Sequence, residues 1–325
     1  MTLAREITKG LRAGVRESVG LEPWGNSQLK RIREAFAKAD KLRILFIGET
    51  IIDEYRYVSK LGASSKEFVM ATVSTGEEEF EGGVVAASKH GEWPLVECLS
   101  PPAAIRKTRF VDGDFNRKLF EVYDQRQIDL HPVVRSKFEM ELNREVSRAD
   151  VVVVTDFGHG LFGPTPRSLL EDGGHYLAVN AQSNAGNFGY NPITNWRRAD
   201  FISIDNPEAR LAAGMRDESI YEVVEALSKK IRCDKFLITH GRQGSYWWDK
   251  ETASASLALA SGGIDTIGAG DAVLAVTAPL VAVDLDMESV ALVGNVVGAL
   301  KIGIVGHRRH VGRDEIMGKL EEVLR

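Results

Sequence analysis

Five short apolar runs, separated by segments with helical patterns, limit most strongly how this chain can fold. The runs cover residues 41–48, 151–155, 176–180, 201–205 and 235–239. Apolar runs of this length are typical of strands buried on both faces, and strands that alternate with helices predict a mostly parallel sheet between two helical layers. The predicted fold class is therefore α/β with three layers.

Each of these runs ends in a glycine or a polar residue. The terminal residues are Gly48, Asp156, Asn180, Asp205 and Thr239. Because ligands of open α/β sheets bind beyond the carboxyl ends of the strands, we expect these residues to meet at one rim of the sheet. Turn residues also end strands for purely local reasons, so a structural role is the alternative.

Two lid segments, at about 54–80 and 107–124, interrupt the alternation of strands and helices. Their short alternating patterns, with a hairpin turn at 112–114, predict a small antiparallel sheet that projects as a lid over the rim or as a dimer contact. Residues 1–40 have apolar side chains at helical spacing and predict a helical extension, for packing or as a dimer arm. The predicted main domain then covers residues 41–325.

The most informative motif is Asp265-Thr-Ile-Gly268-Ala-Gly270-Asp271, which precedes an apolar, helix-compatible stretch. Free amides at the start of a helix, together with the helix dipole, form an anion site, so Gly268, Ala269 and Gly270 predict a phosphate-binding turn. Asp271 in the first helical turn is placed to take the proton from a hydroxyl that attacks a γ-phosphate. The structural alternative is an aspartate that only caps the helix.

This string resembles the C-terminal signature of the PfkB/ribokinase family of carbohydrate kinases, and the resemblance extends over roughly residues 41–310. It implies a ribokinase-like fold with a small β lid, ATP as the donor and Mg²⁺ as the cofactor. The segment from Gly48 to Asp53 resembles the family's first strand with its sugar-binding aspartate. Gly82 and Gly83 resemble the turn that lets the acceptor approach a helix. The resemblance thus implies that Asp53, Gly82 and Gly83 hold the acceptor.

Other segments resemble the nucleotide and metal sides of the family site. The expected nucleotide contacts, taken from the resemblance and from the predicted rim, are Asn180, Thr239, Gly241, Gly244, Thr266 and Asn295. The family's Asn-x-x-Glu motif near the metal corresponds here to Asp205-Asn-Pro-Glu208. Asp205 and Glu208 are therefore the expected magnesium residues, and their hard oxygen ligands suit this ion.

Within the family, the closest likeness is to the heptose 7-phosphate kinases of the ADP-heptose pathway and to related sugar kinases of lipopolysaccharide clusters. It rests on residues 50–55, 118–123, 155–160 and 179–187. Three departures bear on function. Ala86 replaces an expected asparagine, and the segment 87–107 is short by about one strand unit. His159 replaces an expected lysine, so it either carries a pH-dependent charge or makes a local hydrogen bond.

Lys66 in the lid and Arg109 in the hairpin are further candidate acceptor contacts, and arginine suits bidentate binding of a phosphate. Both residues are also explained as solvated charges of exposed turns. The basic cluster at 307–310 is interpreted as a solvated surface turn.

The net charge of -5 argues against a nucleic-acid partner, and the N-terminal region lacks the apolar run of a signal peptide or membrane anchor. We therefore expect a cytoplasmic enzyme that transfers phosphate from ATP to a sugar or sugar phosphate, with a lid-mediated homodimer as one option. Two alternatives stay open. One is a catalytically impaired, ribokinase-like protein that binds a sugar phosphate or nucleotide for regulation. The other is a kinase for a nucleoside or another small alcohol.

Overall fold

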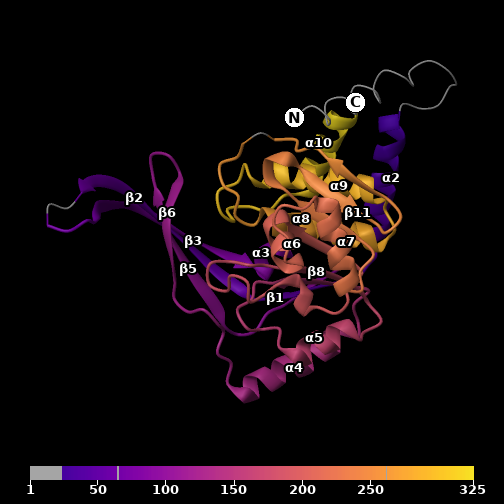
Figure 1. Ribbon diagram of the computed structural model, residues 1–325, viewed down its shortest axis with the longest axis horizontal. Coiled ribbons are helices and arrows are strands. Elements are labelled where there is room, and N and C mark those ends of the chain that lie inside the picture. Colours follow the sequence, from indigo (N-terminus) through magenta and orange to yellow (C-terminus); the bar gives the residue numbers. More distant parts are fainter. Residues whose placement is uncertain (1–23, 64–65, 261) are drawn as a thin grey trace.

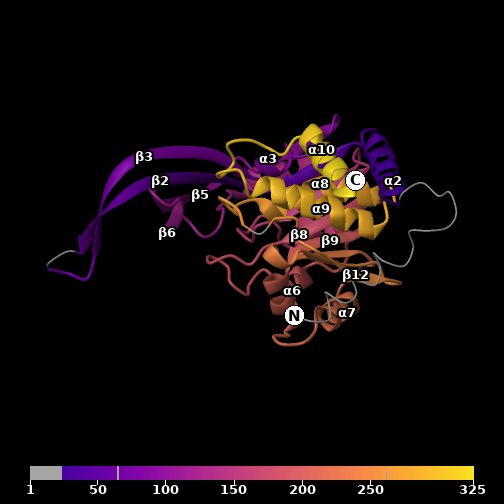
Figure 2. The same cartoon turned by 90° about the horizontal axis from the view of Figure 1, so that it is seen from above.

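The computed structural model describes residues 24–63, 66–260 and 262–325, which form a layered body and a projecting sheet (Figure 1). The body contains an eight-stranded sheet, and a four-stranded sheet extends from one side of it. Figure 2 shows that the long hairpin of the smaller sheet reaches well beyond the body.

The large sheet is mostly parallel, as predicted. Its strand order is β12-β11-β10-β9-β8-β7-β1-β4, and only the β10–β11 and β11–β12 pairs are antiparallel. The strands are β1 (Ile44–Gly48), β4 (Val96–Leu99), β7 (Val151–Asp156), β8 (Tyr176–Ala181), β9 (Phe201–Asp205), β10 (Phe236–Thr239), β11 (Ser245–Trp248) and β12 (Ala253–Ser256). The five strands predicted from apolar runs correspond to β1 and β7–β10 and are confirmed.

Helices cover both faces of this sheet, so the predicted three-layer class is also confirmed. One face carries α2 (Trp24–Ala39), α3 (Val84–Ala87), α8 (Ala269–Ala282), α9 (Met287–Lys301) and α10 (Arg313–Leu324). The other carries α4 (Pro132–Val146), α5 (Pro164–Glu171), α6 (Asn206–Ala213) and α7 (Ile220–Lys230). In β7, Val151 and Val153 join the first core and Val152 and Val154 the second, since successive side chains of a strand point to opposite faces.

Helix α2 packs on the body rather than standing apart from it. Its Ile32 and Phe36 are buried, and Phe36 stacks on Trp93 with ring centroids 5.5 Å apart. Arg33 forms an ion pair with Glu321 of α10. Of the two roles considered for the N-terminal extension, its described part therefore has the packing role, while residues 1–23 lie outside the described residues.

The smaller sheet has the order β3-β2-β5-β6. Its strands are β2 (Thr50–Ala63), β3 (Met70–Gly83), β5 (Ala104–Asp112) and β6 (Arg117–Tyr123). The prediction of an antiparallel sheet is wrong in one respect, because β5 runs parallel to β2. The chain passes through β4 before it enters β5, so it joins the sheet in the direction of β2. The two hairpin strands are also longer than the short segments predicted there.

Strand β4 forms an outer edge of the large sheet beside β1. It lies in the short 87–107 segment, and β5 begins soon after it. None of the described helices has the length and apolar character needed to cross a bilayer.

Candidate active site

A cleft of about 570 Å³ lies between the carboxyl ends of the parallel strands and the base of the smaller sheet. It brings together most of the predicted site residues: Asp53, Gly83, Arg109, Asn180, Asp205, Glu208, Thr239, Gly241, Gly244, Thr266, Gly268, Ala269, Gly270, Asp271 and Asn295. A larger hollow between α4 and α5 contains none of them. The grouping of reactive side chains, rather than size, therefore marks the candidate site.

Two predicted acceptor residues do not line this cleft. A Cβ on Gly82 would lie 2.3 Å from Asp53 Oδ2 and 3.1 Å from His307 Nε2, so glycine is needed for those two side chains to meet. Lys66 lies in the connection between β2 and β3, and the hairpin of these two strands reaches well beyond the body (Figure 2). The prediction that Lys66 contacts an acceptor in its own chain is corrected, because the long hairpin carries it away from the cleft.

The turn before α8 has the geometry of an anion site. Gly268 adopts φ 71°, a left-handed conformation that glycine reaches without strain. Among the described residues, the amides of Gly268, Gly270 and Asp271 have no backbone acceptor, whereas the Ala269 amide donates to Thr266 O at 3.3 Å. The Ala269 amide is therefore not open, although Ala269 belongs to the predicted phosphate-binding turn. The other three lie at the positive end of the helix dipole.

Asp271 is buried at this turn. Burial raises the pKa of Asp271 to about 6, while the nearby charges of His307 and Lys301 favour its ionised form. Gln182 Nε2 donates to Asp271 Oδ1 at 2.7 Å and orients the carboxyl group. Asp271 is thus a poised carboxylate close to three open amides, which is the arrangement that a general base beside an anion site requires.

Asp53 is buried on the smaller sheet and has two cationic partners. Arg109 donates to Asp53 Oδ1, and His307 Nε2 lies 3.2 Å from Asp53 Oδ2. Burial opposes ionisation, but the hydrogen bond of His307 and the charge of Arg109 hold the pKa of Asp53 below its usual value. The guanidinium of Arg109 also lies 3.3 Å from Glu121. Asp53 is therefore a fixed carboxylate rather than a free base.

His307 and Lys107 line the same side of the cleft. The interpretation of 307–310 as a solvated turn is wrong for His307, which is buried against Asp53. It holds for the next residue, Arg308, which is exposed and pairs with Glu78. No local pattern separates the two, because the partner of His307 lies more than two hundred positions earlier.

The nucleotide side of the cleft is formed mainly by backbone and amide groups. Among the described residues, the Oδ1 atom of Asn180 is buried without a hydrogen-bond partner, while its Nδ2 donates to Ser203 O at 2.7 Å. Asn295 Nδ2 donates to Ser256 O at 3.2 Å and to Leu257 O at 3.0 Å. Asn295 thus anchors the strand end near the cleft, whereas Asn180 keeps an acceptor for a ligand. Gly244 adopts φ 95°, a backbone conformation that would be strained for a residue with a side chain.

Asp205 and Glu208 form a capping box at the start of α6. Asp205 Oδ1 accepts from the Glu208 amide at 2.8 Å, and Glu208 Oε1 accepts from the Ser183 amide at 3.0 Å. Burial and the neighbouring Asp205 raise the pKa of Glu208 to about 8. A cation beside the pair would therefore favour its charged form. Within the described ranges, no group of three or more His, Cys, Asp or Glu side chains is placed to hold a metal ion.

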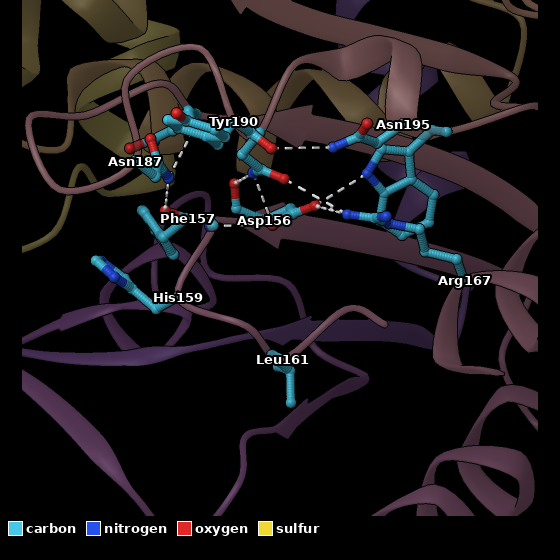
Figure 3. Close-up of polar contacts among 12 residues, drawn as sticks. Asp156, Phe157, His159, Leu161, Arg167, Asn187, Tyr190 and Asn195 are labelled. Atoms are coloured by element: carbon cyan, nitrogen blue, oxygen red, sulfur yellow. Dashed lines mark hydrogen bonds and ion pairs between the residues drawn. The ribbon is translucent and has the colours of Figure 1, made fainter. Parts of the chain in front are cut away.

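Two buried carboxyl groups hold the loop after β7, and Figure 3 shows the contacts of one of them, Asp156. Asp156 accepts a hydrogen bond from Trp196 Nε1 at 3.0 Å, and Glu49 accepts one from the Phe157 amide at 3.1 Å. Burial and the charge of Asp156 raise the pKa of Glu49 to about 8. These contacts fix the loop so that Phe157 lines the cleft.

His159 lies in the same loop (Figure 3). Its ring Nδ1 is 2.8 Å from the Arg126 carbonyl. Burial, with the charge of Lys107, lowers the pKa of His159 to about 4. Of the two roles considered for His159, the local hydrogen bond is the one that the structure has. The ring is neutral at neutral pH and does not line the cleft.

Comparisons with known proteins bear on the fold and the family resemblance of this chain. Residues 192–310 match the profile of the family described as pfkB family carbohydrate kinase. The structure is similar to Arabidopsis thaliana ribokinase complexed with ribose and ATP, with TM-score 0.61, 14% identity and coverage of 86% of this chain and 99% of that one. It is also similar to Escherichia coli phosphofructokinase-2 in complex with substrates and products, with TM-score 0.67, 13% identity and coverage of 87% and 100%. The chain thus has the ribokinase-like α/β fold.

Two curated relatives refine the class. The bifunctional protein HldE of Geotalea uraniireducens is 21% identical over 312 residues, which cover 85% of this chain and 63% of that protein. The D-beta-D-heptose 7-phosphate kinase of Bordetella bronchiseptica is 24% identical over 165 residues, or 50% of this chain and 51% of that protein. The chain therefore spans less than two thirds of these relatives. The match of residues 192–310 to the pfkB family carbohydrate kinase profile agrees with the predicted resemblance to this family.

Proposed function

We propose that this chain transfers the γ-phosphate of ATP to a hydroxyl group of a phosphorylated sugar, with Asp271 as the general base. The observation that carries the proposal is the position of Asp271, buried beside the open amides of the anion turn and across the cleft from Asp53. The carboxylate takes the proton of the acceptor hydroxyl as that oxygen attacks phosphorus. The amides of Gly268 and Gly270 then stabilise the charge on the transferred group.

Mg²⁺ fits the polar end of the cleft. Asp205 and Glu208 are hard oxygen ligands, and the raised pKa of Glu208 reflects negative charge that a cation would compensate. Their capping contacts leave the pair suited to holding the ion through water. The ion would neutralise charge on the phosphates of ATP. Asn180, with its free Oδ1, orients the nucleotide from the neighbouring strand end.

The acceptor side of the cleft favours a substrate that carries a phosphate. Lys107, Arg109 and His307 line it, while Asp53 supplies one carboxylate. Arginine and lysine bind phosphate groups by charge-assisted hydrogen bonds. The names of the relatives, which include a heptose 7-phosphate kinase, point to the same class, so we infer a heptose 7-phosphate as the first acceptor to test.

The smaller sheet supports a homodimer as the assembly state. Its described residues expose large apolar side chains, among them Leu61, Met70, Val73, Phe120 and Val122. Soluble monomers rarely leave such side chains together on one projecting sheet. A second copy that covers this sheet would bury them.

The test is release of ADP from Mg-ATP with a panel of sugars, sugar phosphates and nucleosides. We expect turnover with a sugar phosphate, and loss of turnover but retention of ATP binding in Asp271→Asn. Near wild-type turnover by that variant would remove Asp271 from the role of base. Thermal stabilisation by ATP or a sugar phosphate without any turnover would favour the regulatory binding protein instead.

A further inference from the structure

A lysine is buried directly beneath the anion turn. Lys301, the last residue of α9, is 0% exposed, which is rare because an ammonium group loses its water only where other groups replace it. Its Nζ donates to Ile267 O at 2.6 Å and to Gly306 O at 2.8 Å. Ile267 immediately precedes the anion turn, and Gly306 immediately precedes His307. One ammonium group therefore binds both loops of the active site.

The backbone amides of the same two residues, Ile267 and Gly306, are held by Asp265. Its Oδ1 accepts from the Ile267 amide at 3.1 Å, and its Oδ2 accepts from the Gly306 amide at 2.9 Å. Tyr55 donates to the same carboxylate at 2.6 Å. A fixed cation and a fixed anion thus lock the carbonyl and amide groups of both loops.

The charge of Lys301 acts beyond these two bonds. In the described part of the chain its ammonium has carbonyl oxygens, and no carboxylate, within hydrogen-bond distance. Burial lowers the pKa of Lys301, whereas Asp265 and Asp271 favour its charged form, and Lys301 in turn favours ionised Asp271. A Cβ on Gly268 would lie only 3.5 Å from Lys301 Cε, so the side chain packs against the anion turn itself.

We propose that Lys301 is a tethered cation for phosphoryl transfer, an inference that rests on the proposed kinase function. Its ammonium occupies the place that a free monovalent cation would take between two backbone carbonyl groups. It holds the anion turn and the His307 loop in register and adds positive charge beneath the bound phosphate. Lys301 does not touch the reacting atoms, so it is a positioning residue.

Two substitutions separate its charge from its volume. Lys301→Met keeps most of the volume but has neither charge nor donor. Lys301→Ala leaves the carbonyl groups of Ile267 and Gly306 facing a space that ammonium or methylammonium fits. Lys229→Ala, on the exposed surface of α7, is the matched control for loss of one positive charge.

The experiment measures kcat, ATP binding and thermal unfolding in ammonium, methylammonium, potassium or choline chloride at equal ionic strength. We expect the wild type and Lys229→Ala to be indifferent to the cation. Both Lys301 variants should lose about a hundredfold in kcat, in the range found when one stabilising donor is removed. Ammonium or methylammonium should restore at least tenfold in Lys301→Ala and raise its unfolding temperature, with no such effect on Lys301→Met.

Dependence of the wild type on potassium or ammonium would overturn the proposal, as would equal rescue of Lys301→Ala by choline. If neither variant folds, the dependence of wild-type kcat on the four cations tests the proposal. If the wild type transfers phosphate to no acceptor, the kinase function fails. The unfolding temperatures of Lys301→Ala then still show whether the site takes a cation.

Discussion

The pH dependence of turnover tests the role of Asp271 most directly. With a pKa of about 6, its ionised fraction falls from about nine tenths at pH 7 to about one tenth at pH 5. We therefore expect kcat/KM to fall about tenfold over this interval, with an acid limb centred near pH 6. An ordinary aspartate, with a pKa near 3.9, would stay more than nine tenths ionised at pH 5 and would produce almost no loss.

The effect of Asp271 on the stability of the fold distinguishes this loss of activity from acid unfolding. Because the pKa of Asp271 is raised in the folded protein, its ionisation destabilises the fold. The contribution of this group to the free energy of unfolding therefore increases as the pH falls through about 6. Activity lost through Asp271 should return at once when the enzyme is brought back to pH 7.

The assay measures initial rates of ADP release at saturating Mg-ATP, between pH 5 and 8 at constant ionic strength. His307→Gln removes the neighbouring charge that most favours ionised Asp271, so its acid limb should move to higher pH. If the acid limb came from titration of the substrates instead, it would stay at the same pH in His307→Gln. This variant is therefore the internal control. A wild-type profile that is flat from pH 5 to 8 would refute the assignment of Asp271 as the base.

Three further predictions follow from packing. Arg109→Met leaves a buried carboxylate with one partner fewer, so the free energy of unfolding measured in urea should fall by about 3 kcal/mol and the KM for the acceptor should rise. In Gly268→Ala a Cβ would lie 2.7 Å from a carbon of His307, at a backbone φ of 71°, so the free energy of unfolding should fall by at least about 1–2 kcal/mol. In the control Gly318→Ala a Cβ meets nothing within 4 Å, and we expect no such loss. Phe120→Ser should turn a dimer into a monomer in sedimentation, and an unchanged mass would place the contact elsewhere.

The parts of the fold that the sequence predicts are those with local patterns. Apolar runs that end in polar residues identify the parallel strands and their shared rim, because side-chain periodicity depends only on neighbours in the sequence. The glycine-rich string before Asp271 is likewise local. The direction of β5 was predicted wrongly because strand pairing depends on the path of the chain between strands.

The parts that escape prediction are formed by distant partners. His307 joins the site only because the smaller sheet brings Asp53 to it, and Lys301 looks like any basic residue at a helix C-terminus. A basic residue there is normally explained by the helix dipole. Only burial distinguishes Lys301 from Lys230, which ends α7 in the same manner but stays exposed.

The two carboxylates of the cleft differ in what surrounds them, and this difference assigns their roles. Asp53 is paired with Arg109 and His307, and its pKa is lowered, so it stays charged and can only accept hydrogen bonds from an acceptor hydroxyl. Asp271 is buried without a bonded cation, and its raised pKa lets it take a proton near neutral pH. When their environments push the pKa values of two neighbouring carboxyl groups apart, the groups take different roles in proton transfer, and we propose Asp271, whose pKa lies near neutral pH, as the base. Because both residues are aspartates, only a change in their surroundings would reverse the roles.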